Sequence, residues 1–186
     1  LTGRYDGASQ LADGNKWAFF PSAAIGWRLS EESFIQDLGA FNNLKLRVSY
    51  GEVGNNASIN PYATQANIFQ TFYDFDGTPS LGYTINALSN QGIVWERSKE
   101  INVGLDFSLS DLPISGTVEY YKRNTEDLIL DDKVPNSTGF NNVLGNVGEI
   151  ENSGIEISLN SVNVSTGDFR WTSNLTFTAN DDKVVK

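Results

Sequence analysis

One stretch of strict alternation constrains the fold of this chain more than any other feature. From Ile101 to Ser110, large apolar side chains occupy every odd position, and Asn, Gly, Asp or Ser occupies every even position. Side chains of a strand alternate between its two faces, so the pattern predicts one apolar and one polar face. Strands of soluble domains usually have about 5–6 residues, whereas a tilted strand needs roughly 9–11 to cross a bilayer. The stretch therefore predicts a transmembrane β-strand between lipid and water.

The composition argues against several classes of protein. The chain has 186 residues and a net charge of −10, with no Cys and no His. It therefore lacks a disulfide framework, thiolate zinc ligands and the commonest general base. The acidic balance and the absence of a Lys/Arg stripe argue against a nucleic-acid partner. No apolar run approaches the roughly 18 residues of a membrane helix, so a membrane-spanning chain of this kind requires a closed β-barrel.

The same alternation recurs in several further segments. These segments are residues 22–30, 44–51, 114–121, 154–160 and 169–178. Their polar positions define an inward face that we predict to be wet, because it carries the charged residues Arg28, Lys45, Arg47, Asp106, Glu119, Glu156 and Arg170. We count about seven strands with the N-terminal tail, whereas bacterial single-chain barrels use an even number of roughly eight or more. We therefore expect this segment to belong to a larger wall.

Aromatic residues stand at both ends of the alternating segment near the N-terminus. Trp17, Phe19 and Phe20 lie at one end and Trp27 near the other. Transmembrane barrels carry girdles of aromatic residues at both membrane interfaces, so we interpret these residues as two such girdles.

The connections between the expected strands alternate in length. Turns are short at 110–113 and 161–167 and intermediate at 31–41, where one helical turn fits; longer polar connections occupy 7–16, 52–92 and 127–145. In outer-membrane barrels the turns are short at the periplasmic end and the loops are long outside. The alternation predicts that arrangement, with 127–145 as an exposed loop.

The segment 52–92 is too long for an ordinary connection, so it is either functional or contains a small hairpin of its own. Its aromatic residues Phe72, Tyr73 and Phe75 either contact a ligand such as a sugar ring or form the loop's own small core. The segment Asp74–Gly77 has a faint likeness to a calcium loop but lacks further acidic ligands at the required offsets. We predict no metal site and no cofactor.

Two other classes of protein remain as alternatives. A soluble extracellular β-sandwich, such as a carbohydrate-binding or adhesion module, would use the aromatic loop residues for stacking and the Asp-rich loops for calcium. An enzyme would have to rest on paired carboxylates, as glycosidases do. The nearest candidates by sequence are Glu149 with Glu151 and Asp131 with Asp132, which lie beside turns or loops where charges are ordinary. We predict no catalytic residues and no enzymatic activity.

Several runs of sequence, taken together, resemble a known family. They are NKWAFFPSAAIGWRLSEESF, LKLRVSYGEVGN, IVWERSKEINVGLDFSL, GTVEYYKRNTEDLIL and NVGEIENSGIEISLN. In order and spacing they resemble the distal barrel of SusC/RagA-type TonB-dependent transporters of Bacteroidetes, and the likeness covers essentially the whole chain. The resemblance implies an all-β, antiparallel transmembrane β-barrel of about 22 strands, plugged by an N-terminal domain. Residues 1–186 would be a portion of that barrel domain, without the plug and the final strands.

The resemblance also implies a function and partners. The family imports oligosaccharides, glycans or peptides across the outer membrane, usually beneath a SusD-like surface lipoprotein, with energy delivered by the TonB complex through the plug. This segment would supply barrel wall against outer-membrane lipid, together with extracellular loops that frame the mouth. The inward charges would hold the plug by hydrogen bonds and ion pairs, or would simply be solvated.

Overall fold

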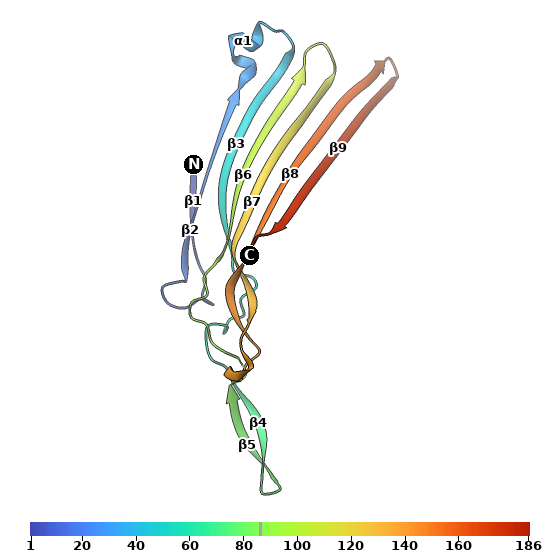
Figure 1. Cartoon of the computed structure of the whole chain (residues 1–186). Helices are drawn as coiled ribbons and strands as arrows, with labels where there is room; N and C mark the ends of the chain where they lie inside the picture. Colours follow the sequence, from blue (N-terminus) through green and yellow to red (C-terminus); the bar gives the residue numbers. More distant parts are fainter. Residues whose placement is uncertain (86) are drawn as a thin grey trace.

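The structure is a computed structural model that describes residues 1–85 and 87–186. Within these residues the elements are β1 (Thr2–Gly7), β2 (Trp17–Arg28), η1 (Leu29–Glu31), α1 (Ser33–Gln36), β3 (Phe41–Asn55), β4 (Ile68–Phe75), β5 (Thr78–Ile85), β6 (Glu96–Leu109), β7 (Ile114–Lys133), η2 (Asn136–Thr138), β8 (Asn142–Thr166) and β9 (Phe169–Val184). Seven strands form one antiparallel sheet in the order β1-β2-β3-β6-β7-β8-β9, and β4 and β5 form a separate hairpin (Figure 1).

The strand register aligns the alternation of neighbouring strands. Leu105 of β6 lies between Leu46 and Val118, while Asp106 lies between Lys45 and Thr117. One row across the sheet consists of Trp27, Leu46, Leu105, Val118, Ile157 and Phe177. We call the side of the sheet that carries this row the apolar face, and the opposite side the polar face. The prediction of one apolar and one polar face is confirmed.

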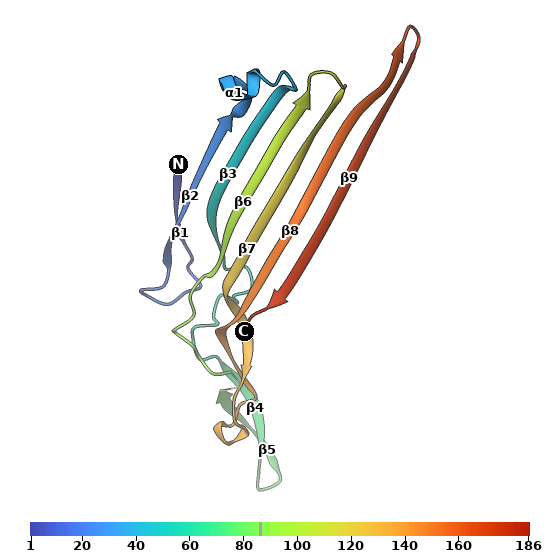
Figure 2. The same cartoon turned by 45° about the horizontal axis from the view of Figure 1, so that its top comes forward.

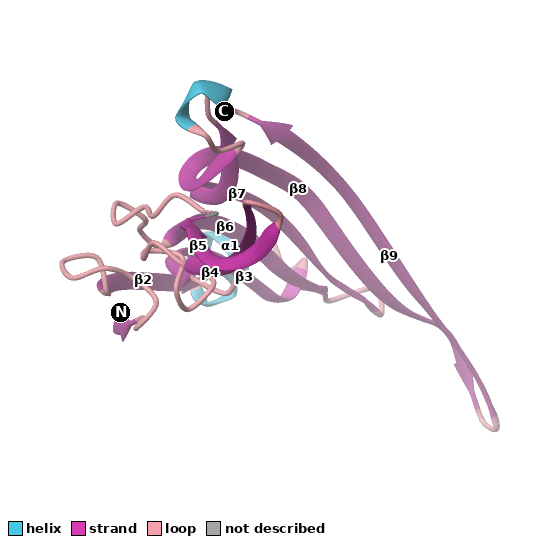
Figure 3. Cartoon of the chain, turned by 90° about the horizontal axis from the view of Figure 1, so that it is seen from below, coloured by secondary structure: helices cyan, strands magenta, loops and turns pink. Residues whose placement is uncertain are grey.

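Within residues 1–85 and 87–186, no second layer of protein covers the apolar face. Ile25, Ile101, Tyr120, Leu175 and Phe177 are all exposed on it. Seen from the loop end, the seven strands form a single open sheet with β2 and β9 far apart (Figure 3). A β-sandwich requires a second sheet packed on such a face. The sandwich alternative is therefore wrong.

The connections sort by end of the sheet as predicted. The connections of β2 to β3, β6 to β7 and β8 to β9 lie together at the end that carries α1, and the other connections lie at the opposite end with the β4–β5 hairpin (Figures 1 and 2). The short helix α1 confirms the expected helical turn. Among the described residues, no helix has both the length and the apolar character needed to cross a membrane.

The boundaries of three connections differ from the prediction. Residues 127–145 are not a loop, because β7 continues to Lys133 and β8 begins at Asn142, which gives a long two-stranded ribbon. The ribbon bends where the register shifts between Thr125 and Leu128. The turn expected at 161–167 is only Gly167 and Asp168, since β8 bulges near Val162 and then continues. The segment 52–92 begins within β3, which continues to Asn55. It also contains the β4–β5 hairpin, as one of the two alternatives for this segment predicted.

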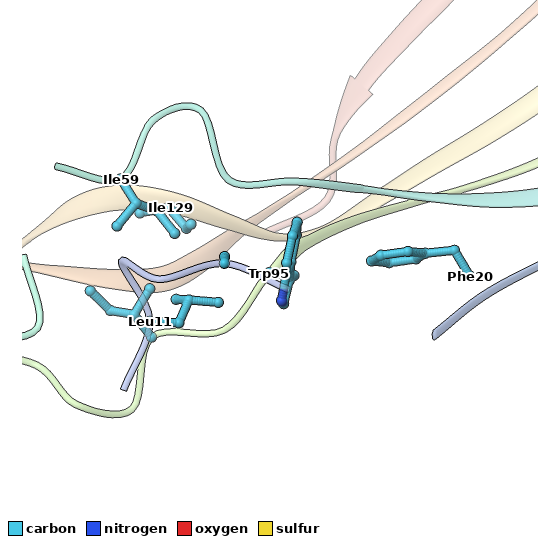
Figure 4. Packing of buried hydrophobic residues seen from close by; sticks show 7 residues of the cluster. Leu11, Phe20, Ile59, Trp95 and Ile129 are labelled. Atoms are coloured by element: carbon cyan, nitrogen blue, oxygen red, sulfur yellow. The ribbon is translucent and has the colours of Figure 1, made fainter. Parts of the chain in front are cut away.

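The buried core lies at the loop end of the sheet, where residues of the long connections pack against Phe20 of β2 and Ile129 of β7. It consists of Ala8, Leu11, Phe20, Ile59, Ile93, Trp95 and Ile129. In Figure 4, Trp95 lies between Phe20 and the aliphatic side chains of Leu11, Ile59 and Ile129. Phe20 is therefore not part of an exposed aromatic girdle, because its ring packs edge-on against Trp95 at a centroid distance of 5.7 Å. Trp17, Phe19 and Trp27 are exposed, as a girdle requires.

Candidate functional site: the polar face and the loop platform

Arg47 is the centre of the polar face. Its Nε donates to Asp106 Oδ2 at 2.8 Å and its Nη2 donates to Glu119 Oε1 at 2.5 Å, so that one guanidinium joins β3, β6 and β7. Gly104 pairs with both Arg47 and Glu119, and the guanidinium lies over it. A Cβ at residue 104 would lie 2.8 Å from Arg47 Nη2. The Arg47 side chain thus crosses β6 through the space that the missing Cβ of Gly104 leaves, and a larger residue at 104 would force the end of that side chain to shift.

The structure separates the seven charged residues predicted for this face. It brings together only Arg47, Asp106 and Glu119. Arg28 lies 3.8 Å from Glu31 of η1, in an exposed pair. The remaining three, Lys45, Glu156 and Arg170, form no ion pair within the described part of the chain. Arg47, Asp106 and Glu119 thus pair with one another within the sheet, and contact between any of the seven residues and the plug stays a prediction.

A shallow polar hollow lies beside the Arg47 group, toward the long loops. Its volume is about 430 Å³, and it is lined by Glu100, Asn102, Glu119, Tyr121, Arg123, Asn152, Glu156 and Asp182. Arg123 Nε donates to Glu100 Oε2 at 2.7 Å within it. Glu100 and Arg123 were not among the predicted site residues, although both continue the alternation of Asn102 and Tyr121. Each lies two residues further along its strand on the same face, so following the alternation one step beyond Asn102 and Tyr121 identifies both.

Glu96 ties several connections together at the loop end of the sheet. Its buried carboxylate accepts hydrogen bonds from Asn55 Nδ2 at 2.5 Å, Ser58 Oγ at 3.3 Å and the backbone N–H of Ile129 at 3.0 Å. A buried carboxylate is costly unless it is hydrogen-bonded, and here three donors satisfy it. The end of β3, the loop after it and the β7–β8 ribbon are thereby held in one arrangement.

Asparagine side chains complete this arrangement. Asn146 Nδ2 donates to the carbonyl oxygens of Val94 at 3.0 Å and Asp127 at 2.7 Å, and its Oδ1 accepts from the N–H of Val94 at 2.9 Å. Asn15 Nδ2 donates to the carbonyl oxygen of Ile93 at 3.3 Å. We call the connections 8–16, 56–67 and 87–95, together with the β7–β8 ribbon, the loop platform.

One surface ion pair stands at the edge of the loop platform. Lys16 Nζ lies 2.6 Å from Asp13 Oδ1 and donates a hydrogen bond to it. That bond lowers the pKa of the Asp13 carboxyl below its ordinary value. The pair closes a short turn between β1 and β2, and it is too exposed to stabilise the fold by much.

The β4–β5 hairpin extends from the loop platform with its aromatic residues exposed. Phe72 lies opposite Leu81, whereas Tyr73 and Phe75 lie on the other face of the hairpin. The exposed fractions are 72% for Phe72, 52% for Tyr73 and 76% for Phe75. The hypothesis that these residues form a small core of the loop is therefore wrong, and their rings are accessible from outside.

The turn of this hairpin explains the segment that resembled a calcium loop. Asp76 and Gly77 have φ angles of 54° and 73°. Two successive residues with positive φ form the type I′ turn that two-residue hairpins prefer, for which Asp-Gly is a favoured sequence. In the described residues, no group of His, Cys, Asp or Glu side chains could hold a metal ion. The Asp-Gly pair is thus a turn signal.

Comparisons with known proteins agree with this geometry. A family model described as TonB dependent receptor-like, beta-barrel matches residues 1–185. The chain is 40% identical over 185 residues to TonB-dependent receptor P26 of Formosa agariphila, covering 100% of this chain and 19% of that protein. It is 34% identical over 192 residues to TonB-dependent receptor SusC of Bacteroides thetaiotaomicron, again covering 100% of this chain and 19% of the relative.

A solved structure shows the same arrangement of strands. The structure of the RagAB peptide importer in the "open-open" state superposes with a TM-score of 0.86 at 28% identity, over 99% of this chain and 20% of that chain. The present chain therefore spans about a fifth of the length of the relatives that it matches.

Proposed function

Because the chain belongs to the TonB-dependent receptor-like β-barrel family, we propose that it forms part of the wall and part of the extracellular rim of an active importer. Proteins of this family reside in the outer membrane, and so does this segment of β-barrel. The curated relatives are TonB-dependent receptors. In the longer protein, residues 1–186 would be one portion of the barrel domain, and the plug would be supplied by another part.

The observation that carries the proposal is the register of the seven-stranded sheet. It places Leu46, Leu105 and Val118 in one apolar row and Lys45, Asp106 and Thr117 in the next row on the opposite face. A wall of this kind suits lipid on one side and water on the other. We propose that the polar face is directed to the barrel interior, where Arg28, Lys45, Arg47, Asp106, Glu119, Glu156 and Arg170 contact the plug or the water around it.

The cargo of the importer would be a glycan or a peptide, and the hairpin β4–β5 would contact it. Three aromatic rings, those of Phe72, Tyr73 and Phe75, are exposed at the end where the long loops lie. Flat aromatic surfaces bury large apolar area at low entropic cost and suit both sugar rings and peptide side chains. The RagAB structures describe a peptide importer, and SusC is a TonB-dependent receptor, so similarity to both leaves the two substrate classes as alternatives.

The proposed partners follow from the family. A SusD-like surface lipoprotein would cover the extracellular mouth, above the loop platform. The TonB complex would act through the plug, which holds the barrel from inside. The wall described here would stay static while those parts move, which is consistent with the hydrogen bonds of Glu96 and Asn146 that fix the loops to one another.

Uptake by whole cells tests the proposal. Cells that lack the full-length protein should fail to take up one class of polymer, either a glycan or a peptide, and the full-length gene should restore uptake. The triple variant Phe72→Ala/Tyr73→Ala/Phe75→Ala should bind that polymer more weakly, because three stacking surfaces are lost. Replacing three polar hairpin residues instead, as in Gln70→Ala/Thr71→Ala/Ser80→Ala, is the matched control. Unchanged uptake in the deletion strain for both polymer classes would overturn the proposal.

A further inference from the structure

The connection between β2 and β3 is more elaborate than the other connections at its end of the sheet. Residues 29–40 form η1 and then α1, whereas β6 and β7 are joined by residues 110–113 and β8 and β9 by a two-residue turn. Backbone hydrogen bonds run through the connection, among them Asp37 N–H to the carbonyl of Ser33 at 2.9 Å. Gly39, with φ of +62°, then lets the chain leave the helix. The connection 29–40 is therefore an ordered pair of short helices, whereas the other two connections at this end are short turns.

A side-chain contact directs this connection to the apolar face. Trp27 alternates with Ile25 along β2 and pairs with Leu46, so it lies on the apolar face. Its Nε1 donates to Glu32 Oε1 at 2.9 Å. Glu32 immediately precedes α1, so this bond positions α1 beside the last row of the apolar face. Figure 2 shows α1 at the end of β2, next to the start of β3.

The connection exposes large apolar side chains. Phe34 is 56% exposed and Leu38 is 66% exposed. Phe34 lies within α1, and Leu38 lies two residues beyond its end, in a turn where the Leu38 N–H donates to the carbonyl oxygen of Ile35 at 3.2 Å. Leu112, on the neighbouring β6–β7 connection, is also exposed, and the two connections are joined by a hydrogen bond from Ser110 N–H to the carbonyl of Ala40 at 3.0 Å. Phe34, Leu38 and Leu112 thus place exposed apolar side chains beyond the ends of the strands.

We propose that the connection 29–40 is an interfacial anchor, in which Phe34 and Leu38 insert into the phospholipid of the periplasmic leaflet. Lipid that covers the apolar face would also contact this connection. Trp27, at the end of that face, would then lie at the headgroup level that Trp prefers. The charged residues of the connection, with Arg28 at its start, are Arg28, Glu31, Glu32 and Asp37, so no cationic cluster attracts anionic lipid. The anchor therefore works by apolar insertion into zwitterionic phospholipid, as an amphipathic segment does.

Spin-label accessibility in the full-length protein tests the anchor. Single-cysteine variants Phe34→Cys and Leu38→Cys would be labelled after reconstitution into phosphatidylethanolamine–phosphatidylcholine vesicles, with any cysteine elsewhere in the protein replaced. Collisions with oxygen, which concentrates in lipid, are compared with collisions with a water-soluble nickel chelate. Asp37→Cys is the matched control on the same connection, and Ile25→Cys reports the apolar face itself.

The expected result is an oxygen-to-nickel ratio above one at Phe34 and Leu38, as at Ile25, and below one at Asp37. A ratio at Phe34 and Leu38 equal to that at Asp37 would overturn the anchor and leave these residues in water. Low collision rates with both reagents would also overturn it, because protein would then cover the site. The inference rests on the barrel orientation proposed above, and Ile25 separates the two. Lipid exposure at Ile25 without lipid exposure at Phe34 rejects the anchor alone, whereas water exposure at Ile25 rejects both.

Discussion

The alternation of side chains along β3 places Arg47 on the polar face, where it contacts the two following strands of the sheet. Its side chain reaches from β3 across Gly104 of β6 to Glu119 of β7, and Asp106 holds it on the way. The side chains of Arg47, Asp106 and Glu119 are each about one-third exposed or less. Exposed pairs contribute little, but a bidentate arginine in a network is the favourable case. The group therefore links three strands at the centre of the polar face.

A double-mutant cycle should detect this linkage. Arg47→Gln and Glu119→Gln each remove one charge, and the double variant removes both from the contact. We expect a coupling free energy on the order of 1 kcal/mol in the free energy of unfolding, because the two side chains stabilise each other only when both are present. Urea titration of the full-length protein in bilayers provides the measurement. Additive effects of the two substitutions would show that the pair contributes nothing.

The side of the sheet on which a charge is placed should decide whether it is tolerated. Leu105→Arg puts a guanidinium on the apolar face near its middle and should destabilise the barrel by roughly 2–4 kcal/mol if that face meets lipid. Asn102→Arg is the matched control, since Asn102 lies on the polar face in the hollow with Glu100 and Glu119. Membrane assembly, followed by the fraction of protein that migrates faster before boiling, reports the difference. Equal behaviour of both variants would reject the assigned facing.

At the scale of elements, the loop platform differs from the strands that support it. The strands hold each other by a regular ladder, whereas the platform is held by single polar side chains from distant parts of the chain. Glu96 bonds to residues of the β3 end and to Ile129 of β7, and Asn146 of β8 bonds to Val94 and Asp127. Buried polar networks of this kind stabilise only when every member is satisfied. The platform should therefore respond strongly to a change at one member.

Replacing Glu96 with Gln should loosen the platform locally. Asn55 Nδ2 donates to one oxygen of the Glu96 carboxylate and the N–H of Ile129 donates to the other, so the N–H₂ group of Gln would leave one of these donors without an acceptor. The expected cost is about 1–3 kcal/mol of local stability. Hydrogen exchange at the amide of Ile129 should accelerate, while amides of β6 on the membrane side stay protected. The exposed Glu31→Gln is the control, and equal exchange in the two variants would contradict the role assigned to Glu96.

At the scale of the whole molecule, the described sheet has one apolar face, one polar face and two outer strands, β1 and β9. Each outer strand has a row of backbone groups with no strand beside it in the described part of the chain. A sheet edge of this kind recruits other strands unless it is closed into a barrel. The two faces and the two edges together make this sheet a segment of wall that requires neighbouring strands and lipid.

The isolated chain should therefore not behave as an independent domain. Residues 1–186, expressed alone and refolded in buffer without detergent, should form aggregates in size-exclusion chromatography, because Ile25, Leu175 and Phe177 would stay exposed to water. The full-length protein, in contrast, should be extracted from the outer membrane by detergent. A monodisperse species of the isolated chain at about its own mass of 20.4 kDa would contradict this prediction.

Properties that repeat every two residues can be predicted from the sequence alone. Alternation sets which residues share a face, and the number of alternating stretches sets the number of strands, so the sequence predicts the apolar and polar faces. The resemblance to SusC/RagA-type transporters likewise depends on short runs such as LKLRVSYGEVGN. The three-dimensional structure was needed to identify the partners of Arg47, the burial of Phe20, the extension of β7 and β8 into a ribbon, and the assembly of the loop platform. These features depend on contacts between residues far apart in the chain, such as Asn55 with Glu96 and Asn146 with Val94. Local pattern cannot specify such contacts, because the polar loop residues that make them follow no period.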